Sequence, residues 1–240
     1  MREIVLEGPG KNAMSTALMT GLRASLRAAG DDAVLLTGAG GVLSAGLDLK
    51  EIAGLDPKGI EAYLALLEAL VFDLYTYPGP TVVAAPGHAI AGGCVLTIAC
   101  DHRVLTRAGG TRVGLNEVAL GLRFPPRVLR LARDRVPRRH HEEVLLGAGL
   151  FAPERALAVG LVDELADDPL AVARERGAAL EALPRDAYVA AKARLRAGVL
   201  DLSPDVVADF VRTDLPSWTS DALKVRVRAV LARTGAKAAS

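Results

Sequence analysis

Cysteine and aromatic residues are both scarce in this chain of 240 residues. Its two cysteines, Cys94 and Cys100, make neither a disulfide framework nor a CxxC metal motif, so we expect both to be small core residues. Aromatic side chains make up 4% of the sequence, against 51% for hydrophobic residues as a whole. The core is therefore predicted to be aliphatic and rich in alanine.

An excess of charge of either sign is also absent. Lysine and arginine number 29 and aspartate and glutamate 28, which gives a net charge of +1. A nearly neutral chain without a basic tail lacks the electrostatic signature of a nucleic-acid binder or of a protein that binds membrane surfaces. With 24% charged residues, the composition is typical of a folded globular protein, and we expect a small molecule as its partner.

The sequence lacks an uninterrupted apolar segment that could cross a membrane. Its longest uncharged run covers residues 74–100, but three prolines and four glycines break it, which indicates a buried strand, a turn and a helix. The first residues lack the basic start and apolar run of a secretory signal. We therefore expect a cytoplasmic protein without membrane contact.

The hydrophobic pattern predicts an α/β core followed by a helical region. Short apolar runs bounded by turn residues predict four strands, at 2–6, 33–37, 81–85 and 101–105. Apolar residues at helical spacing predict three helices in the same half, at 15–28, 60–75 and 93–99. Beyond residue 124 the pattern is helical at 125–135, 138–146, 154–158, 169–183, 185–199, 204–212 and 217–233, with one short strand at 160–165. Strands that alternate with helices are typical of crossover units in a parallel sheet.

Glu117 is the carboxylate with the most informative surroundings. It lies in the segment VGLNEVALGL, among aliphatic residues. Such neighbours raise the pKa of a carboxyl group toward the range in which a general base works. An exposed carboxylate at a turn or at the entry to a helix would have the same local sequence, so both interpretations stay open at this point.

The histidines show no metal-ligand spacing. No HExxH motif is present, and we predict no metal site. His140 and His141 lie in RRHHEE, which is typical of a solvated helix face. His88 follows a Pro-Gly pair and precedes two glycines, so it could either face a pocket or make a structural hydrogen bond.

Two glycine-rich segments could bring backbone N–H groups close to a ligand. They are TGAGGVLSAGLDL and PGHAIAGGCVL, and neither has the spacing of a dinucleotide or nucleotide-triphosphate loop. In the second segment, Gly92 and Gly93 would open a helix, whose first N–H groups have no partner within the helix. Two such groups that converge on one carbonyl oxygen would form an oxyanion hole.

The motifs TGAGGVLSAGLDLKEI, AGGCVLTIACDHRVL, GLNEVALGL and LLGAGLFAPERALAVGLVDEL, taken in order, resemble the enoyl-CoA hydratase/isomerase (crotonase) superfamily over residues 2–165. The GLNE and SAGLDL stretches are most similar to the mitochondrial-type Δ3,Δ2-enoyl-CoA isomerases. The resemblance implies an α/β fold with a spiral core of ββα turns. It also implies a spiral domain at 1–180 with the active site, and a helical oligomerisation region at 181–240 that forms homotrimers or hexamers.

The resemblance also implies a substrate and the residues that bind it. The substrate is an acyl-CoA thioester, so that coenzyme A belongs to the substrate and no separate cofactor is needed. Its carbonyl oxygen would accept hydrogen bonds from the backbone N–H groups of Leu47 and Gly92. The substrate-binding residues that the matched motifs imply are Ser44, Ala45, Gly46, Leu47, Asp48, Leu49, Gly93 and Asn116. Residues Ile52, Leu66, Leu70 and Leu122 would wall the acyl pocket.

One carboxylate separates the isomerase reaction from hydration. Hydratases of this family use two carboxylates, and the position of the first is occupied here by Val95, which cannot activate water. The second position is Glu117. A single acid/base is what an isomerase needs, because the same group removes a proton from C2 of a 3-enoyl thioester and returns it to C4. We therefore predict a Δ3,Δ2-enoyl-CoA isomerase with Glu117 as its only acid/base.

Other functions stay open beside this prediction. Hydration, thioester hydrolysis or decarboxylation would need a second group, for which His88 is the candidate. The family's usual Asn-Arg-Pro after an early strand reads Glu7-Gly8-Pro9 here, and an extra N-terminal strand is absent, which affects expected CoA contacts. A non-catalytic acyl-CoA-binding subunit is a further alternative. An RNA binder is disfavoured, because the helix at 15–28 offers only Arg23 and Arg27 where such a relative has many lysines. Basic residues of the C-terminal helices, Lys192 among them, stay unassigned.

Overall fold

A parallel sheet of five strands forms the centre of the molecule. The computed structural model describes the backbone of residues 1–238 and the side chains of residues 1–229. The central strands lie in the order β1-β2-β3-β5-β7, and β4 pairs with β6 in a second sheet. The strands are β1 (Arg2–Leu6), β2 (Val34–Gly38), β3 (Thr81–Ala85), β4 (Ala89–Ile90), β5 (His102–Thr106), β6 (Val113–Gly114) and β7 (Glu164–Ala166). Because neighbouring strands are parallel, the chain must cross over between them.

Helices and helical turns make up much of the remaining chain. The N-terminal half has α1 (Pro9–Asn12), α2 (Thr16–Ala29), η1 (Ala39–Gly41), α3 (Leu49–Gly54), α4 (Pro57–Tyr75), α5 (Gly92–Ala99) and η2 (Val118–Leu120). The C-terminal half has α6 (Pro126–Arg135), η3 (Arg138–His140), η4 (Glu142–Leu146), α7 (Pro153–Ala158), α8 (Pro169–Glu181), α9 (Arg185–Arg196), α10 (Pro204–Asp209), η5 (Phe210–Asp214), α11 (Leu215–Thr219) and α12 (Asp221–Ala238). Side-chain caps start several of them: Ser15 accepts a hydrogen bond from the first turn of α2, and Asp48 does the same for α3.

The second sheet stacks the segments that follow the central strands. Ala89 in β4 pairs with Val113 in β6, and isolated bridges join Ser44 to Ala89 and Val113 to Phe151. Successive turns of the chain therefore run through a central strand, a short outer strand and a helix. This arrangement is the ββα spiral that the sequence resemblance implies.

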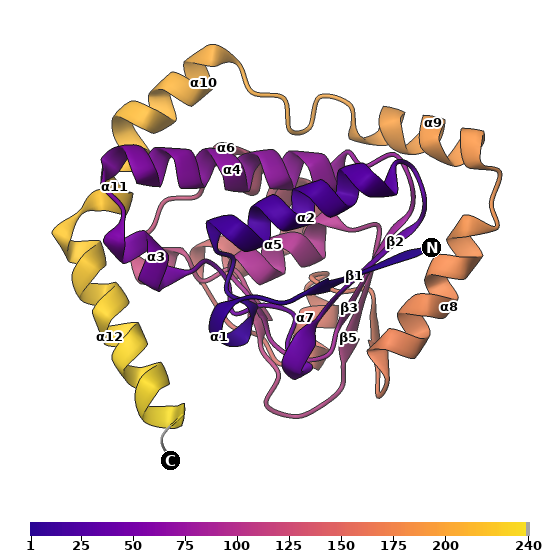
Figure 1. Ribbon diagram of the computed structural model, residues 1–240, viewed down its shortest axis with the longest axis horizontal. Helices are drawn as coiled ribbons and strands as arrows, with labels where there is room; N and C mark the ends of the chain where they lie inside the picture. Colours follow the sequence, from indigo (N-terminus) through magenta and orange to yellow (C-terminus); the bar gives the residue numbers. More distant parts are fainter. Residues whose placement is uncertain (239–240) are drawn as a thin grey trace.

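Alternate residues of the central strands pack into two different cores. Leu36, Val83 and Leu105 belong to the large core that contains the buried side chains of α2, α4 and α5. Leu35 and Val82 face a smaller core that α8 closes from the other side. Figure 1 shows α8 across the sheet from α2 and α4. Both faces of the sheet are thus covered, as a parallel sheet requires.

The C-terminal helices follow the outside of this core (Figure 1). α11 packs on α4, and α12 contacts α3 and η2 of the same chain. Leu223 and Val227 of α12 bury their side chains in this contact. Among the helices that the structure describes, none is long and apolar enough to cross a membrane.

The elements predicted from the sequence are present with shifted ends. The predicted strands at 2–6 and 81–85 coincide with β1 and β3. The strand predicted at 160–165 is shorter and begins at Glu164. The sequence did not predict α3, β4 and β6, because such short elements carry too little periodicity to detect. The division of the chain at residue 180 and the part of residues 181–240 in oligomerisation stay predictions.

Candidate active site

The outer sheet places residues from separate turns of the spiral at one end of its strands. Gly92 comes directly after β4, and Glu117 follows β6. Because β4 and β6 are parallel and paired in register, both residues leave the sheet at the same end. The backbone N–H of Ala91 extends this pairing, since it donates to the carbonyl oxygen of Gly114 at 2.8 Å. The bridge at Ser44 aligns the preceding turn of the spiral with them.

Two backbone N–H groups, those of Leu47 and Gly92, lie close together at this end. A Cβ atom placed on Gly92 would lie 3.6 Å from the Leu47 nitrogen, and one placed on Gly46 would lie 3.5 Å from the Gly92 nitrogen. Neither group donates to an acceptor within the described residues. For Gly92 this follows from its place as the first residue of α5. Neighbouring donors without acceptors are suited to bind a carbonyl oxygen and the oxyanion formed from it.

Hydrogen bonds between the loops fix the two donors relative to each other. The N–H of Ser44 donates to the carbonyl oxygen of His88 at 3.1 Å, and the N–H of Ile90 donates to that of Ser44 at 3.0 Å. The Ser44 hydroxyl accepts from the N–H of Gly46 at 3.1 Å and donates to the carbonyl oxygen of Asn12 at 2.7 Å. The segment before Leu47 is therefore held by both its backbone and its serine.

Close packing at the donors leaves no room for larger residues. Gly46 has φ +97°, and a Cβ there would lie 2.9 Å from the carbonyl oxygen of Ile90. A Cβ on Gly92 would lie 2.6 Å from the sulfur of Met14. Ala91 has φ +48°, a conformation that costs a residue with a Cβ on the order of 1–3 kcal/mol. The strained backbone of Ala91 directs the chain into α5 and sets the position of the next N–H.

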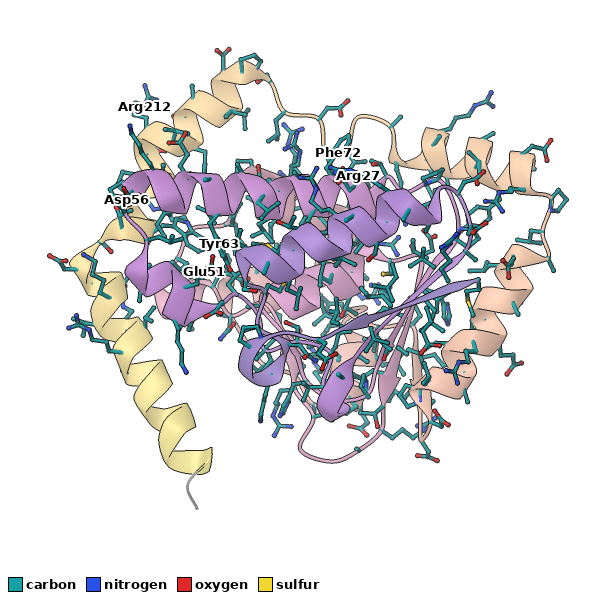
Figure 2. All side chains as sticks on the ribbon, in the orientation of Figure 1. Arg27, Glu51, Asp56, Tyr63, Phe72 and Arg212 are labelled. Carbon is teal, nitrogen blue, oxygen red and sulfur yellow. The ribbon has the colours of Figure 1, made fainter. Side chains whose placement is uncertain are left out.

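Tyr63 of α4 supports the loop that carries Leu47. Its hydroxyl donates to the carbonyl oxygen of Met14 and accepts from the N–H of Asp48 at 3.1 Å. Burial raises the pKa of the Tyr63 hydroxyl far above its ordinary value, so the group keeps its proton and remains a donor. Figure 2 shows Tyr63 together with Glu51, whose carboxylate accepts hydrogen bonds from the first residue of α2. This contact ties α3 and the Leu47 loop to α2.

Glu117 is a buried carboxylate without a counter-charge. It is 5% exposed, and its Oε2 has no hydrogen-bond partner among the described residues. Burial raises the pKa of Glu117 from 4.5 to about 7, and the residue's own backbone N–H opposes this rise. The N–H of Leu122 donates to the Glu117 carbonyl oxygen at 2.9 Å and holds the turn. A carboxyl group that titrates near neutrality can both accept and return a proton.

The other carboxylates near the Leu47 loop are engaged in structural hydrogen bonds. Asp48 accepts from the N–H groups of Lys50 and Glu51, at 3.0 and 3.1 Å. Glu51 accepts from the N–H of Thr16 at 2.9 Å. Val95, in the position where a hydratase would have its first carboxylate, is 1% exposed within α5. On the described loops, Glu117 is thus the buried carboxylate whose Oε2 has no hydrogen-bond partner.

His88 makes a structural hydrogen bond between two loops. Its Nδ1 accepts a hydrogen bond from the N–H of Arg112 at 3.0 Å, and its carbonyl oxygen holds the neighbouring loop. Burial lowers the pKa of His88, and the positive charges of Lys11 and Arg112 lower it further. Both effects favour the neutral imidazole, which agrees with Nδ1 acting as an acceptor. In the part of the chain that the structure describes, no three His, Cys, Asp or Glu side chains gather where they could hold a metal ion.

The remaining predicted substrate-binding residues lie along the same two loops and beside Glu117. Ser44 and Gly93 are buried, Ala45 is exposed, and Asp48, Leu49 and Asn116 are partly buried. The Oδ1 atom of Asn116 is buried and, like Oε2 of Glu117, has no hydrogen-bond partner within the described residues. Two adjacent polar side chains without partners are unusual in a protein interior and favour a binding site.

The predicted wall residues differ in their exposure. Ile52 and Leu122 are almost fully buried, Leu66 is partly buried, and Leu70 is completely enclosed in the large core. Sequence reasoning missed Met14 and Tyr63, which both contact the donor loops. The one available signal is a tyrosine among the apolar residues of the helix 60–75, because a buried hydroxyl must find partners.

Comparison with known proteins adds independent information. A family model described as enoyl-CoA hydratase/isomerase matches residues 1–210. Enoyl-CoA delta isomerase 1, mitochondrial, of Mus musculus is 34% identical over 165 residues, which cover 67% of this chain and 57% of that protein. The mitochondrial methylglutaconyl-CoA hydratase of Rattus norvegicus is 29% identical over 168 residues, covering 65% of this chain and 50% of that protein. The matched part of the chain thus spans little more than half the length of these relatives.

A solved structure agrees with the fold over almost the whole chain. The crystal structure of human mitochondrial Δ3-Δ2-enoyl-CoA isomerase superimposes with a TM-score of 0.88 at 28% identity. The superposition covers 98% of this chain and 95% of that one. The similarity therefore includes the C-terminal helices as well as the spiral core.

Proposed function

The chain belongs to the enoyl-CoA hydratase/isomerase family, and from this membership we propose that it moves the double bond of a 3-enoyl-CoA thioester to the 2-position. The observation that carries the proposal is the single buried carboxylate of Glu117, at the end of the outer sheet where the N–H groups of Leu47 and Gly92 lie together. A double-bond shift needs one acid/base and a stabilised enolate. Hydration needs a second group to position and activate water.

The proposed reaction begins with the thioester carbonyl oxygen accepting hydrogen bonds from Leu47 and Gly92. The Glu117 carboxylate removes a proton from C2, and the C–H electron pair moves toward the thioester carbonyl. C1 and C2 become joined by a double bond, and the carbonyl oxygen takes the negative charge of a dienolate that still holds the C3–C4 double bond. Its negative oxygen is stabilised by the two donors, each of which is typically worth about 10²–10³ in rate. Glu117, now protonated, returns the proton to C4. The atoms balance without a cofactor, since coenzyme A leaves as part of the product.

The environment of Glu117 suits both halves of this reaction. A pKa of about 7 leaves a large fraction of the carboxylate form at neutral pH and makes the protonated form a competent acid. The absence of a charged partner within the described residues leaves its Oε2 able to reach a substrate carbon. Asn116, with an unpartnered Oδ1 beside it, is proposed to orient a donor group of the substrate.

Hydration is the second candidate, because a methylglutaconyl-CoA hydratase is among the relatives of this chain. It would require a water held between Glu117 and another catalytic group. Val95 offers none, and the Nδ1 of His88 is engaged with Arg112. The homotrimer or hexamer and the cytoplasmic location expected from the sequence stay predictions under either reaction.

The test is incubation with trans-3-hexenoyl-CoA, with absorbance to detect the conjugated thioester and mass spectrometry to identify products. We expect conjugation without a change of mass. The rate of the Glu117→Gln variant should be lower than that of the wild type by a factor of about 10²–10⁴, while the variant still binds the thioester. The Glu61→Gln variant, which changes an exposed glutamate on α4, is the matched control and should retain the wild-type rate.

Two results would contradict the proposal. A product heavier by one water would show hydration, and would require a second catalytic group that the described loops do not present. Wild-type turnover by the Glu117→Gln variant would remove Glu117 from the chemistry. Conjugation that depends on Glu117, with no gain of water, would leave the isomerase reaction as the one that fits.

A further inference from the structure

A cleft of about 780 Å³ opens on the side of the molecule away from the candidate active site. It lies between α8, α9 and the residues that precede β5, including Asp101. Gly92 and Glu117 follow the carboxyl ends of their strands, whereas this cleft lies at the amino-terminal end of β5. Its volume falls in the range of about 300–1,000 Å³ that is typical of small-molecule sites. Nothing in the proposed reaction uses it.

Positive charge exceeds negative charge at the base of the cleft. Lys192 and Arg196, both from α9, share the single carboxylate of Asp101, at 2.7 and 2.5 Å. Lys192 is 7% exposed and Arg196 5% exposed. Asp101 is saturated by further donors, among them the hydroxyl of Tyr188 at 2.8 Å and the N–H of Thr81 at 2.7 Å. One carboxylate therefore faces two buried cations.

A third cation, Arg135 at the end of α6, also lines the cleft. Its guanidinium donates to the carbonyl oxygens of Ile98 and Cys100, both at 3.0 Å. Within the described residues it forms no salt bridge. Carbonyl oxygens satisfy hydrogen bonds but do not neutralise the charge, and the carboxylates that act on Arg135, Asp163 and Asp101, also bind Arg103, Lys192 and Arg196. Buried charges in proteins are normally compensated by a partner of opposite sign.

The donors of these cations are not all used. The Nε of Arg196 is buried and has no hydrogen-bond partner among the described residues, although its two outer nitrogens bind Asp101 and the carbonyl oxygen of Tyr75. A buried guanidinium N–H without an acceptor is costly. An anion in the cleft would add negative charge beside this guanidinium.

Burial and like-charge repulsion affect the ionisation of the same groups. The pKa of Lys192 falls to about 8, because burial and the neighbouring Arg196 outweigh the attraction of Asp101. The pKa of Arg135 is also lowered, by burial first and then by the charges of Arg103 and Arg196. Asp163 and Asp101 oppose the fall for Arg135 without cancelling it, so burial decides the direction for both cations.

The walls of the cleft are apolar. Leu180 of α8 and Leu195 of α9 line it, together with alanines of both helices. Leu195 is 76% exposed, an unusual position for a large aliphatic side chain at the mouth of a charged cavity. A ligand with an anionic group and an aliphatic part would match the base and the wall at once.

We propose that this cleft binds a phosphate monoester, with the phosphate against Arg135, Lys192 and Arg196 and the organic group along Leu180 and Leu195. A phosphate carries close to two negative charges at neutral pH, and its several oxygens can accept hydrogen bonds from more than one cationic side chain. The site is separate from the acyl-CoA site, and its occupancy does not depend on the proposed reaction.

The test is calorimetric titration of the intact protein with inorganic phosphate and with n-hexyl phosphate, in chloride buffer of matched ionic strength. We expect both to bind, with n-hexyl phosphate several-fold tighter because of the buried alkyl surface. The Arg135→Gln variant should weaken both by about tenfold or more. The Arg133→Gln variant, an exposed change on the same helix with the same loss of charge, should bind as the wild type does.

A second variant distinguishes the contribution of the apolar wall to ligand binding from that of the cationic base. Leu195→Ser should weaken the binding of n-hexyl phosphate and leave the binding of inorganic phosphate unchanged. Because Leu195 is exposed, this substitution should not disturb folding. Should Arg135→Gln fail to fold, Arg176→Gln at the rim replaces it and should weaken both ligands by a smaller factor. Absence of binding to the wild type, equal binding by the arginine variant and the wild type, or no preference for the alkyl ester would overturn the proposal.

Discussion

Replacement of Glu117 by glutamine is expected to stabilise the folded protein at neutral pH and above. The carboxyl group is 5% exposed and has no counter-charge among the described side chains, and its burial raises its pKa from 4.5 to about 7 in the folded chain. Ionising it therefore costs more free energy in the folded state than in the unfolded state. Glutamine has almost the same shape and carries no charge to desolvate, so it removes this cost.

The sign and size of this effect on the free energy of unfolding follow from the pKa values of Glu117 in the unfolded and folded chain. Below pH 4.5 Glu117 is protonated in both states and does not affect the pH dependence of stability. Between pH 4.5 and 7 the unfolded chain releases this proton while the folded chain retains it, so the free energy of unfolding falls as the pH rises. Above this interval the loss is constant. At about 1.4 kcal/mol for each pH unit, the wild type loses about 3 kcal/mol.

Urea unfolding of both proteins between about pH 5 and pH 8 measures this effect. The free-energy difference between Glu117→Gln and the wild type should be small at the acidic end and approach about 3 kcal/mol at the alkaline end. Other titrating groups are present in both proteins, so their contributions cancel in the difference. Glu61→Gln controls for the loss of one negative charge and should show no such trend. A difference that does not change with pH would refute the argument that Glu117 is ionised at a cost.

Three further substitutions test the supports of the site and the fold. Gly92→Ala places a Cβ 2.6 Å from the Met14 sulfur and should displace a donor, lowering kcat by about 10²–10³ in the hexenoyl-CoA assay. Tyr63→Phe leaves buried groups without partners and should lower the free energy of unfolding by about 1–3 kcal/mol, together with kcat. Asp101→Asn leaves buried Lys192 without its carboxylate and should cost about 3–5 kcal/mol by urea unfolding.

Each of these has a control and an opposing result. Gly21→Ala, in α2 with open space around the added methyl, should keep full activity and gain up to about 1 kcal/mol of stability. Equal losses of activity in the Gly21 and Gly92 variants would dismiss the steric argument. A Tyr63→Phe protein of normal stability and rate would show that the hydroxyl does not support the loop. Unchanged stability of Asp101→Asn would show that another group compensates the cations.

The parts of the structure that local sequence encodes were predictable. The apolar runs at 2–6 and 81–85 are long enough to show their strands, and the small residues after the second run predict α5. The aliphatic neighbours of Glu117 indicated a raised pKa, which burial in the structure explains. The helix start expected at Gly92 is also present, since α5 begins at this residue.

The parts that depend on distant residues were not predictable. Asp101 looked like the start of a strand, yet it binds Lys192 and Arg196, 91 and 95 residues further along the chain. No local pattern marks such a pair, and a lysine on a helix usually belongs to a solvated face. Tyr63 was missed for the same reason, because the groups that its hydroxyl binds become neighbours only through the spiral.

The two donors of the candidate site are main-chain N–H groups, which every residue except proline possesses. Substitution at Leu47 therefore changes a side chain but leaves its donor in place, whereas proline would remove it. An inserted or deleted residue between β2 and Leu47, or between β3 and Gly92, would displace one N–H donor relative to the other, so that the two would no longer lie together. The site thus tolerates changes of residue type more readily than changes of chain length. This tolerance is consistent with a chain that shares 28% identity with the human isomerase and still superimposes on it with a TM-score of 0.88.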